Sequence, residues 1–205
     1  MKKILTLIAL FAAAVTAFAQ MTDAERYAKI KSLNAGTKDP VRLAVLEAYE
    51  SLIHKTPENF SAIQAEFTKI YAKHNLPAAE RDRQLCGFAL WNYQQKFVKE
   101  SYALARANGF PTAFWAVYYY RTKLGIAEKE EFEMLAKGML HKTVPLRIKN
   151  IVCDRILEMA PGLDSKMVKE TLTTLNRTLT PFLLTEQKGQ YENMVSKIRT
   201  MLGAY

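Results

Sequence analysis

Histidine and cysteine are the side chains that most often bind metals or act as nucleophiles, and the chain has three histidines and two cysteines. His54, His74 and His141 are isolated in the sequence. None of them lies three or four positions from another histidine or from a cysteine, which is the spacing of many zinc ligands. The chain also contains no G-x-S-x-G turn, no H-E-x-x-H motif and no glycine-rich phosphate loop. We therefore expect neither a metal nor a cofactor.

One carboxylic acid stands in a pattern that suggests catalysis. Glu100 is followed by Ser101, and this pair resembles the Glu-Ser of the lytic transglycosylases. The resemblance implies cleavage of cell-wall glycan, with Glu100 as the proton donor. The Gly-Leu-Met-Gln motif that follows in that family is absent. A second acidic run, from Glu128 to Glu133, falls in the first turns of an expected helix, where carboxylates interact favourably with the helix dipole.

Aromatic side chains are concentrated in two neighbouring stretches of the chain. Tryptophan and tyrosine on a concave helical surface commonly anchor a partner. Aromatic residues at helical spacing also commonly fill a core, and the sequence leaves both interpretations open. The candidate binding residues of this group are Trp91, Trp115, Tyr118, Tyr119 and Tyr120.

Basic side chains form their densest patch between residues 137 and 155, and Asp154 is the only acidic residue within it. The formal net charge of the whole chain is +9. The patch favours acidic glycans, lipid headgroups or an acidic protein as a partner. The alternative is a solvated basic face. The candidate binding residues of this group are Lys137, Lys142, Arg147, Lys149 and Arg155, with His141 among them.

Cys86 and Cys153 are the only cysteines, and both fall in apolar stripes of expected helices. They are a disulfide candidate, because an exported chain meets an oxidising environment. The alternative is a pair of buried thiols that pack as small hydrophobic side chains.

The first residues have the features of a secretory signal peptide. Lys2 and Lys3 precede an apolar run, and the run ends in the small-residue pattern Ala17-Phe18-Ala19. We expect cleavage between Ala19 and Gln20, a periplasmic or secreted protein, and no membrane span afterwards. Residues 20–205 are expected to form a single domain, because no linker or low-complexity stretch interrupts them.

Nearly every later segment has the apolar periodicity of an amphipathic helix, and none alternates as a strand does over a useful length. We expect an all-α fold of about nine helices, stacked as antiparallel hairpins in a short solenoid-like array or a closed multi-helix bundle. The expected helix starts lie near residues 22, 40, 57, 78, 111, 127, 145, 164 and 186.

Two of these helices are expected to make the core. Residues 77–108 contain no helix breaker except Gly87, so the pattern predicts one helix of about 30 residues. The next helix, over 110–125, begins near Pro111 and ends at Gly125. Because it is apolar on both sides, we expect it to be central.

A short segment near the C-terminus resembles a known motif. Leu184-Thr185-Glu186-Gln187, followed by Tyr191 and Met194, is similar to the Leu-Thr-x-x-Gln repeats of the Spy/CpxP family of periplasmic helical chaperones. The chain has one such copy, and the resemblance implies a protein that holds unfolded clients. The same residues also predict a helix that begins after an N-cap at Thr185.

Three functions remain after these observations. The sequence favours an exported binding or scaffold protein without catalytic activity, whose partner is a protein or an anionic envelope component rather than a nucleic acid. A Spy/CpxP-like holding chaperone is the second hypothesis. A glycan-cleaving enzyme that uses a glutamic acid is the third.

Overall fold

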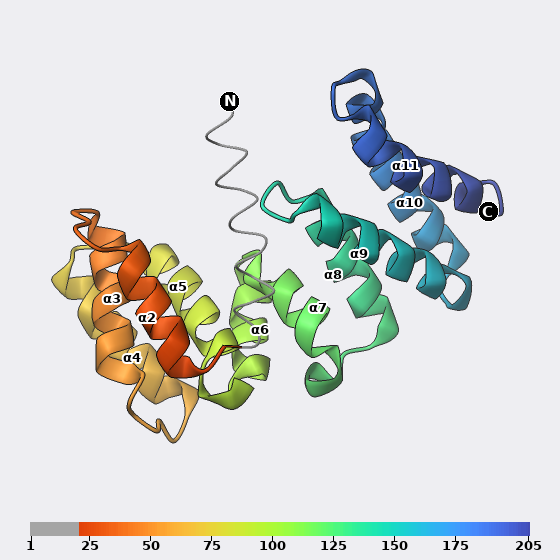
Figure 1. The fold of residues 1–205 in the computed structure, drawn as a ribbon. Helices are drawn as coiled ribbons and strands as arrows, with labels where there is room; N and C mark the ends of the chain where they lie inside the picture. The colour runs from red at the N-terminus through yellow and green to blue at the C-terminus, as the bar shows by residue number, and fades with distance from the viewer. Residues whose placement is uncertain (1–20) are drawn as a thin grey trace. The chain divides into compact units, whose positions relative to one another are not determined.

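The computed structural model describes residues 21–205, so the expected signal peptide and its cleavage site lie outside the described residues. In this part of the chain every regular element is a helix, and there are ten α-helices and three short 3-10 helices (Figure 1). The predicted all-α class is confirmed. None of the described helices is both long and apolar enough to span a membrane.

The described residues form two compact units, 21–124 and Gly125–Tyr205, each with many contacts inside it. In the first unit each helix packs on the helix before it and the helix after it, and α5 also contacts α7. Short connections between such neighbours produce helix hairpins. The helices of this unit are α2 (Asp23–Leu33), α3 (Pro40–Leu52), α4 (Phe60–Lys73), α5 (Ala78–Trp91), η1 (Tyr93–Gln95), α6 (Val98–Ala107) and α7 (Thr112–Leu124).

In the second unit two helix hairpins pack against each other. The helices α8 and α9 pair, α10 and α11 pair, and the two hairpins meet where α8 contacts α10 and α9 contacts α11. The helices are α8 (Glu128–Leu140), α9 (Leu146–Met159), η2 (Ala160–Gly162), α10 (Ser165–Leu179), η3 (Thr180–Leu184) and α11 (Lys188–Leu202). The expectation that residues 20–205 form a single domain remains a prediction.

Two helix starts follow the expected capping chemistry. Thr22 and Glu25 form a capping box at the start of α2, in which the side chain of each accepts a bond from the backbone N–H of the other. Asp39 caps α3, and Pro40 occupies the first helical position, where its missing N–H costs nothing.

Two other helix starts were placed too early. The third helix was expected from residue 57, but α4 begins at Phe60, because Asn59 accepts a bond from the N–H of Ala62 at 3.0 Å. The last helix begins at Lys188, so Thr185 is not its N-cap. The hydroxyl of Thr185 instead donates to the carbonyl of Phe182 at 2.8 Å, within a turn.

The predicted single helix over 77–108 is wrong, and its division explains why the structure has ten helices where about nine were expected. The helix α5 ends at Trp91, and the backbone then reverses so that α6 packs against α5. Asn92 closes α5, because its side-chain amide donates to the carbonyl of Phe88 at 2.6 Å. The reversal places the two apolar stripes of this stretch inside one unit.

The core of the first unit is rich in aromatic side chains. Phe88 of α5 lies at its centre, with ring centroids 4.7 Å from Tyr49, 5.3 Å from Phe67 and 5.7 Å from Tyr93. These contacts join α3, α4, α5 and the turn after α5. The helix α5 is therefore part of the core, as expected for the stretch 77–108 that contains it.

Candidate functional site

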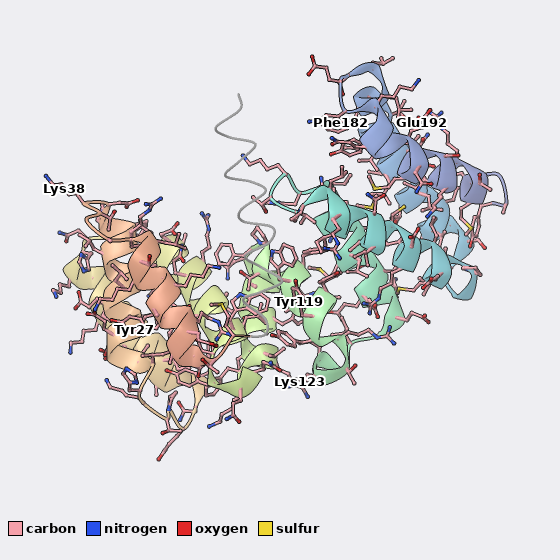
Figure 2. All side chains as sticks on the ribbon, in the orientation of Figure 1. Tyr27, Lys38, Tyr119, Lys123, Phe182 and Glu192 are labelled. Carbon is pink, nitrogen blue, oxygen red and sulfur yellow. The ribbon has the colours of Figure 1, made fainter. Side chains whose placement is uncertain are left out.

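The five aromatic residues singled out in the sequence lie together in the first unit. Trp91 is the last residue of α5, and the other four are on α7, where Tyr119 is labelled in Figure 2. The ring of Tyr119 is central, with centroids 5.4 Å from Trp91 and 5.9 Å from Trp115. We call this group the aromatic cluster; its members are Trp91, Trp115, Tyr118, Tyr119 and Tyr120.

The aromatic cluster is only partly enclosed. Trp115 is 8% exposed, whereas the other four side chains are half-buried. The hydroxyl of Tyr119 is enclosed, yet among residues 21–205 it has no hydrogen-bond partner. Burial, together with the neighbouring phenols, raises the pKa of Tyr119 to about 12, so this hydroxyl keeps its proton at neutral pH. Buried hydroxyls normally have a partner, so this group is an exception among the described residues.

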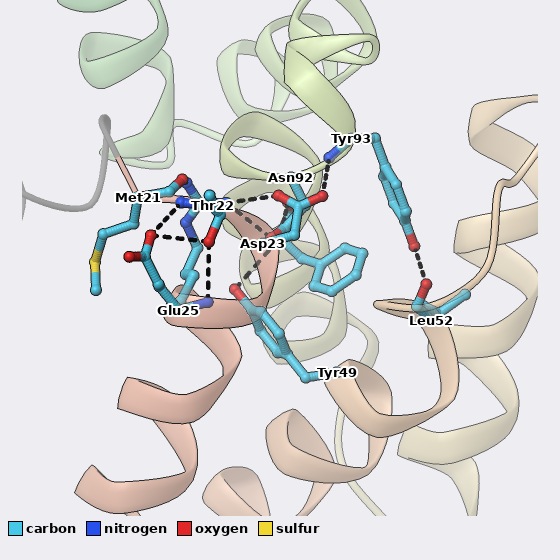
Figure 3. A network of polar contacts seen from close by, with 10 residues as sticks. Met21, Thr22, Asp23, Glu25, Tyr49, Leu52, Asn92 and Tyr93 are labelled. Carbon is cyan, nitrogen blue, oxygen red and sulfur yellow. Dashed lines mark hydrogen bonds and ion pairs between the residues drawn. The ribbon is translucent and has the colours of Figure 1, made fainter.

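A buried polar network lies directly beside the aromatic cluster. Asn92 is fully buried and accepts a hydrogen bond from the guanidinium of Arg26 at 3.0 Å (Figure 3). Arg26 is 2% exposed and also pairs with Asp23 at 3.0 Å and donates to the carbonyl of Met21 at 2.8 Å. Burial raises the pKa of Tyr120, and the positive charge of Arg26 partly opposes this effect. The hydrogen bond between Arg26 and Asn92 connects the start of α2 to the end of α5.

The residues after Asn92 form a left-handed turn, which we define as Tyr93, Gln94 and Gln95. Their φ angles are 56°, 51° and 63°. No glycine is present, although left-handed backbone disfavours every residue with a Cβ by about 1–2 kcal/mol. Interactions from other helices hold the turn: Asp23 accepts from the N–H of Tyr93 at 3.2 Å, and Lys123 donates to Gln95 at 2.7 Å.

Sequence reasoning missed Arg26, Asn92 and the turn. Asn92 was a detectable signal, because an amide among the apolar residues of a predicted core helix needs a polar partner. Arg26 gave no signal, because α2 is a polar helix in which an arginine is ordinary.

The basic residues belong to the second unit and do not share one environment. Lys137, Lys142 and Arg147 are exposed, but Lys149 is 7% exposed, and burial lowers the pKa of its ammonium. Arg155 forms an ion pair with Glu131, which is 2% exposed.

Histidines occupy ordinary positions. His141 lies between α8 and α9, and burial together with Lys142 and Lys149 lowers its pKa. His74 ends α4 and contacts Glu47 at 2.9 Å. Within residues 21–205 no three metal-ligating side chains are grouped in a way that could hold an ion.

The two cysteines are buried free thiols in the structure. Cys86 is on α5 in the first unit, and Cys153 is on α9 in the second. Burial raises the pKa of Cys86 to about 12 and that of Cys153 to about 11. In the structure, therefore, both cysteines pack as small hydrophobic side chains and are not joined in a disulfide.

Glu100 lies in the first turn of α6 with an exposed side chain. Its neighbour Ser101 is buried and donates a hydrogen bond to the carbonyl of Cys86 at 2.7 Å. The serine therefore joins α6 to α5, which gives Ser101 a structural role.

Comparison of the chain with protein-family models, with curated proteins and with solved structures finds no match.

Proposed function

We propose that the chain is an exported, non-catalytic binding protein that holds its partner at the aromatic cluster. One observation carries the proposal: five aromatic rings from α5 and α7 contact one another while four of them remain half-buried. Exposed aromatic surface of this kind is typical of protein interaction sites.

Two further features support this surface. Tyrosine and tryptophan combine a large apolar area with a polar end, which suits them to the centre of an interface. The rings of Trp91 and Tyr118 are half-buried, so part of their area stays in contact with solvent and can be covered by a partner.

The partner that we propose is a protein or an anionic component of the cell envelope. Export is expected from the signal-peptide features of the sequence, and the formal net charge of +9, which becomes +7 without Lys2 and Lys3, favours an acidic partner. Within the second unit, Lys137, Lys142 and Arg147 are exposed cations.

Tryptophan fluorescence tests the proposal directly, because Trp91 and Trp115 are the only tryptophans in the chain and both belong to the aromatic cluster. Partners captured from the envelope fraction are purified and titrated into the protein. A partner that binds the cluster shifts the tryptophan emission, and Tyr118→Ala weakens its binding by removing a half-buried ring of the cluster. The matched control is Tyr27→Ala, which removes a half-buried ring from α2 in the same unit. Equal losses of binding in Tyr118→Ala and Tyr27→Ala would refute the assignment.

A holding chaperone is the second candidate, and one observation favours it. Leu184, the first residue of the Leu-Thr-x-x-Gln motif, is 91% exposed. An apolar side chain in water at this position is available for unfolded clients. The test is suppression of client aggregation by the purified protein, with Leu184→Ser as the variant. If the protein does not delay aggregation at equimolar ratio, this candidate is rejected.

The glycan-cleaving hypothesis has less support from the geometry. A general acid in a glycosidase works in an enclosed site beside a second carboxylate, and the side chain of Glu100 is exposed. Digestion of cell-wall glycan by the wild type, lost in Glu100→Gln, would reinstate the hypothesis.

A further inference from the structure

A cleft of about 500 Å³ lies in the first unit, beside the left-handed turn and apart from the rings of the aromatic cluster. One side is the loop after α3, residues 53–57. The other side is made by Tyr93, Gln94 and Lys96, and Asp23 completes the lining. This volume is in the range of sites that take small molecules, about 300–1,000 Å³.

The two lysines of the cleft are not neutralised by carboxylates. The ammonium of Lys96 donates to the carbonyls of Pro57 and Glu58 at 3.1 and 2.9 Å, which orients it but leaves its charge. The ammonium of Lys55 donates to the hydroxyl of Ser51 at 3.2 Å. As far as the structure describes the chain, neither ammonium has an acidic side chain as its partner.

The one carboxylate of the lining is already engaged. Asp23 accepts from the guanidinium of Arg26 at 3.0 Å and from the N–H of Tyr93 at 3.2 Å. Its charge is therefore balanced by Arg26, and the excess charge of the cleft is positive. His54 lines the same cleft and can add a further hydrogen bond.

The left-handed turn gives the cleft an unusual wall. Three consecutive residues with positive φ persist only where the surrounding structure holds them, and such strain is concentrated at ligand sites. In this conformation the exposed Gln94 and the half-buried ring of Tyr93 both line the cleft. An amide and a ring beside two ammonium groups can bind the polar and the apolar parts of one small molecule.

From this arrangement we infer that the cleft binds a small oxyanion, a molecule with a phosphate or carboxylate group, through the ammonium groups of Lys55 and Lys96. The phosphate or carboxylate oxygens accept charge-assisted hydrogen bonds from the two lysines. The remainder of the molecule lies against Tyr93 and Gln94. The inference does not depend on the proposed partner of the aromatic cluster.

Calorimetric titration of residues 20–205 tests the inference with inorganic phosphate, citrate and glucuronate, and with glucose as the neutral control. At least one anion should bind at one site per chain, and the relative affinities distinguish a phosphate-bearing from a carboxylate-bearing ligand. Lys55→Gln and Lys96→Gln should each weaken binding about tenfold or more, the usual effect of losing a hydrogen bond to a charged group.

Lys99→Gln is the matched control, because it removes the same charge from an exposed position on α6 that does not line the cleft. Its affinity should stay within about twofold of the wild type, since an exposed charge that does not contact the ligand is screened by salt. Lys96→Gln also loosens the loop after α3, so Lys55→Gln gives the cleaner result if the two disagree. The inference is overturned if no anion binds more tightly than about 1 mM, a weak affinity for a specific site. Binding of glucose at similar strength, or an equal loss in Lys99→Gln, overturns it as well.

Discussion

Arg26 donates a hydrogen bond to Asn92 at 3.0 Å across 66 positions of sequence, and both side chains are almost completely buried. This bond fixes the start of α2 against the end of α5. It is also the point where the aromatic cluster and the left-handed turn meet, since Trp91 precedes Asn92 and Tyr93 follows it.

Replacement of Asn92 by leucine should destabilise the protein strongly. The change leaves the buried guanidinium of Arg26 with one acceptor fewer, and we expect a loss of about 3 kcal/mol in the free energy of unfolding. Urea denaturation measures it. Asn150→Ala is the control, because Asn150 makes the same type of bond to its own helix, at 3.2 Å, without a long-range partner. A loss in Asn92→Leu no larger than in Asn150→Ala would show that the network contributes little.

Glycine at the centre of the left-handed turn should stabilise the protein. Gln94→Gly removes the Cβ from a residue with φ of 51°, and we expect a gain of about 1 kcal/mol in unfolding free energy. Gln84→Gly, in the middle of α5, should instead lose about 1 kcal/mol, because the same substitution there removes helix propensity. The midpoint temperatures of thermal denaturation of the two variants should therefore shift in opposite directions. A shift of both midpoints in the same direction would contradict the left-handed conformation.

The two tryptophans should differ in their effect on stability. Trp115→Ala should lose about 3–5 kcal/mol, as large-to-small changes in a core do, because Trp115 is 8% exposed. Trp91→Ala should lose roughly half as much, since Trp91 is half-buried and a smaller area leaves water. Equilibrium denaturation followed by circular dichroism measures both, because the signal does not depend on tryptophan. Equal losses would mean that the aromatic cluster is uniformly buried.

Both thiols should be protected in the folded protein and free after unfolding. With pKa values of about 12 and 11, Cys86 and Cys153 hold their protons at pH 8, and only the thiolate reacts. A thiol reagent should modify neither cysteine quickly in the native state. It should titrate two thiols per chain in denaturant without reductant. No titratable thiol in the unfolded chain would establish the disulfide instead.

Stability should decrease above pH 9. Burial raises the pKa of Cys86 and of Cys153 from the ordinary 9.0, and it raises the pKa of Tyr49 from 10.0 to about 12. Folding therefore favours the protonated forms. Their contribution to the free energy of unfolding is complete below pH 9. It is lost as pH rises through about 11 and 12, because the unfolded chain then releases protons that the folded chain retains. Chemical denaturation at pH 8 and pH 10.5 should show the decrease. An unchanged midpoint would mean that these groups are not desolvated.

Much of the fold could be predicted from local sequence, because capping residues and apolar stripes act over a few positions. The capping box of Thr22 and Glu25 and the Asp39-Pro40 start are examples. The break after Trp91 could not be predicted in this way. It is held by Asp23 and Arg26, which are distant in sequence, and the turn contains no glycine to mark it.

The candidate site was predictable in part for the same reason. The members of the aromatic cluster on α7 are neighbours in sequence, so their grouping was visible, and only the contact with Trp91 needed the fold. The cleft beside the turn depends on the loop after α3 and on Lys96, which no local pattern connects. The burial of Lys149 and Glu131 was equally invisible, because charged residues on a helix usually face water.

The packing of each helix in the first unit on its neighbours in sequence has a consequence for folding kinetics. Contacts between neighbouring helices close short loops, so we expect a low contact order and rapid formation of the hairpins. The bond between Arg26 and Asn92 closes a much longer loop. The chain within that loop must lose conformational entropy before the contact is made. The first helix of the unit should therefore dock last, after α5 and α6 have formed the turn that receives it.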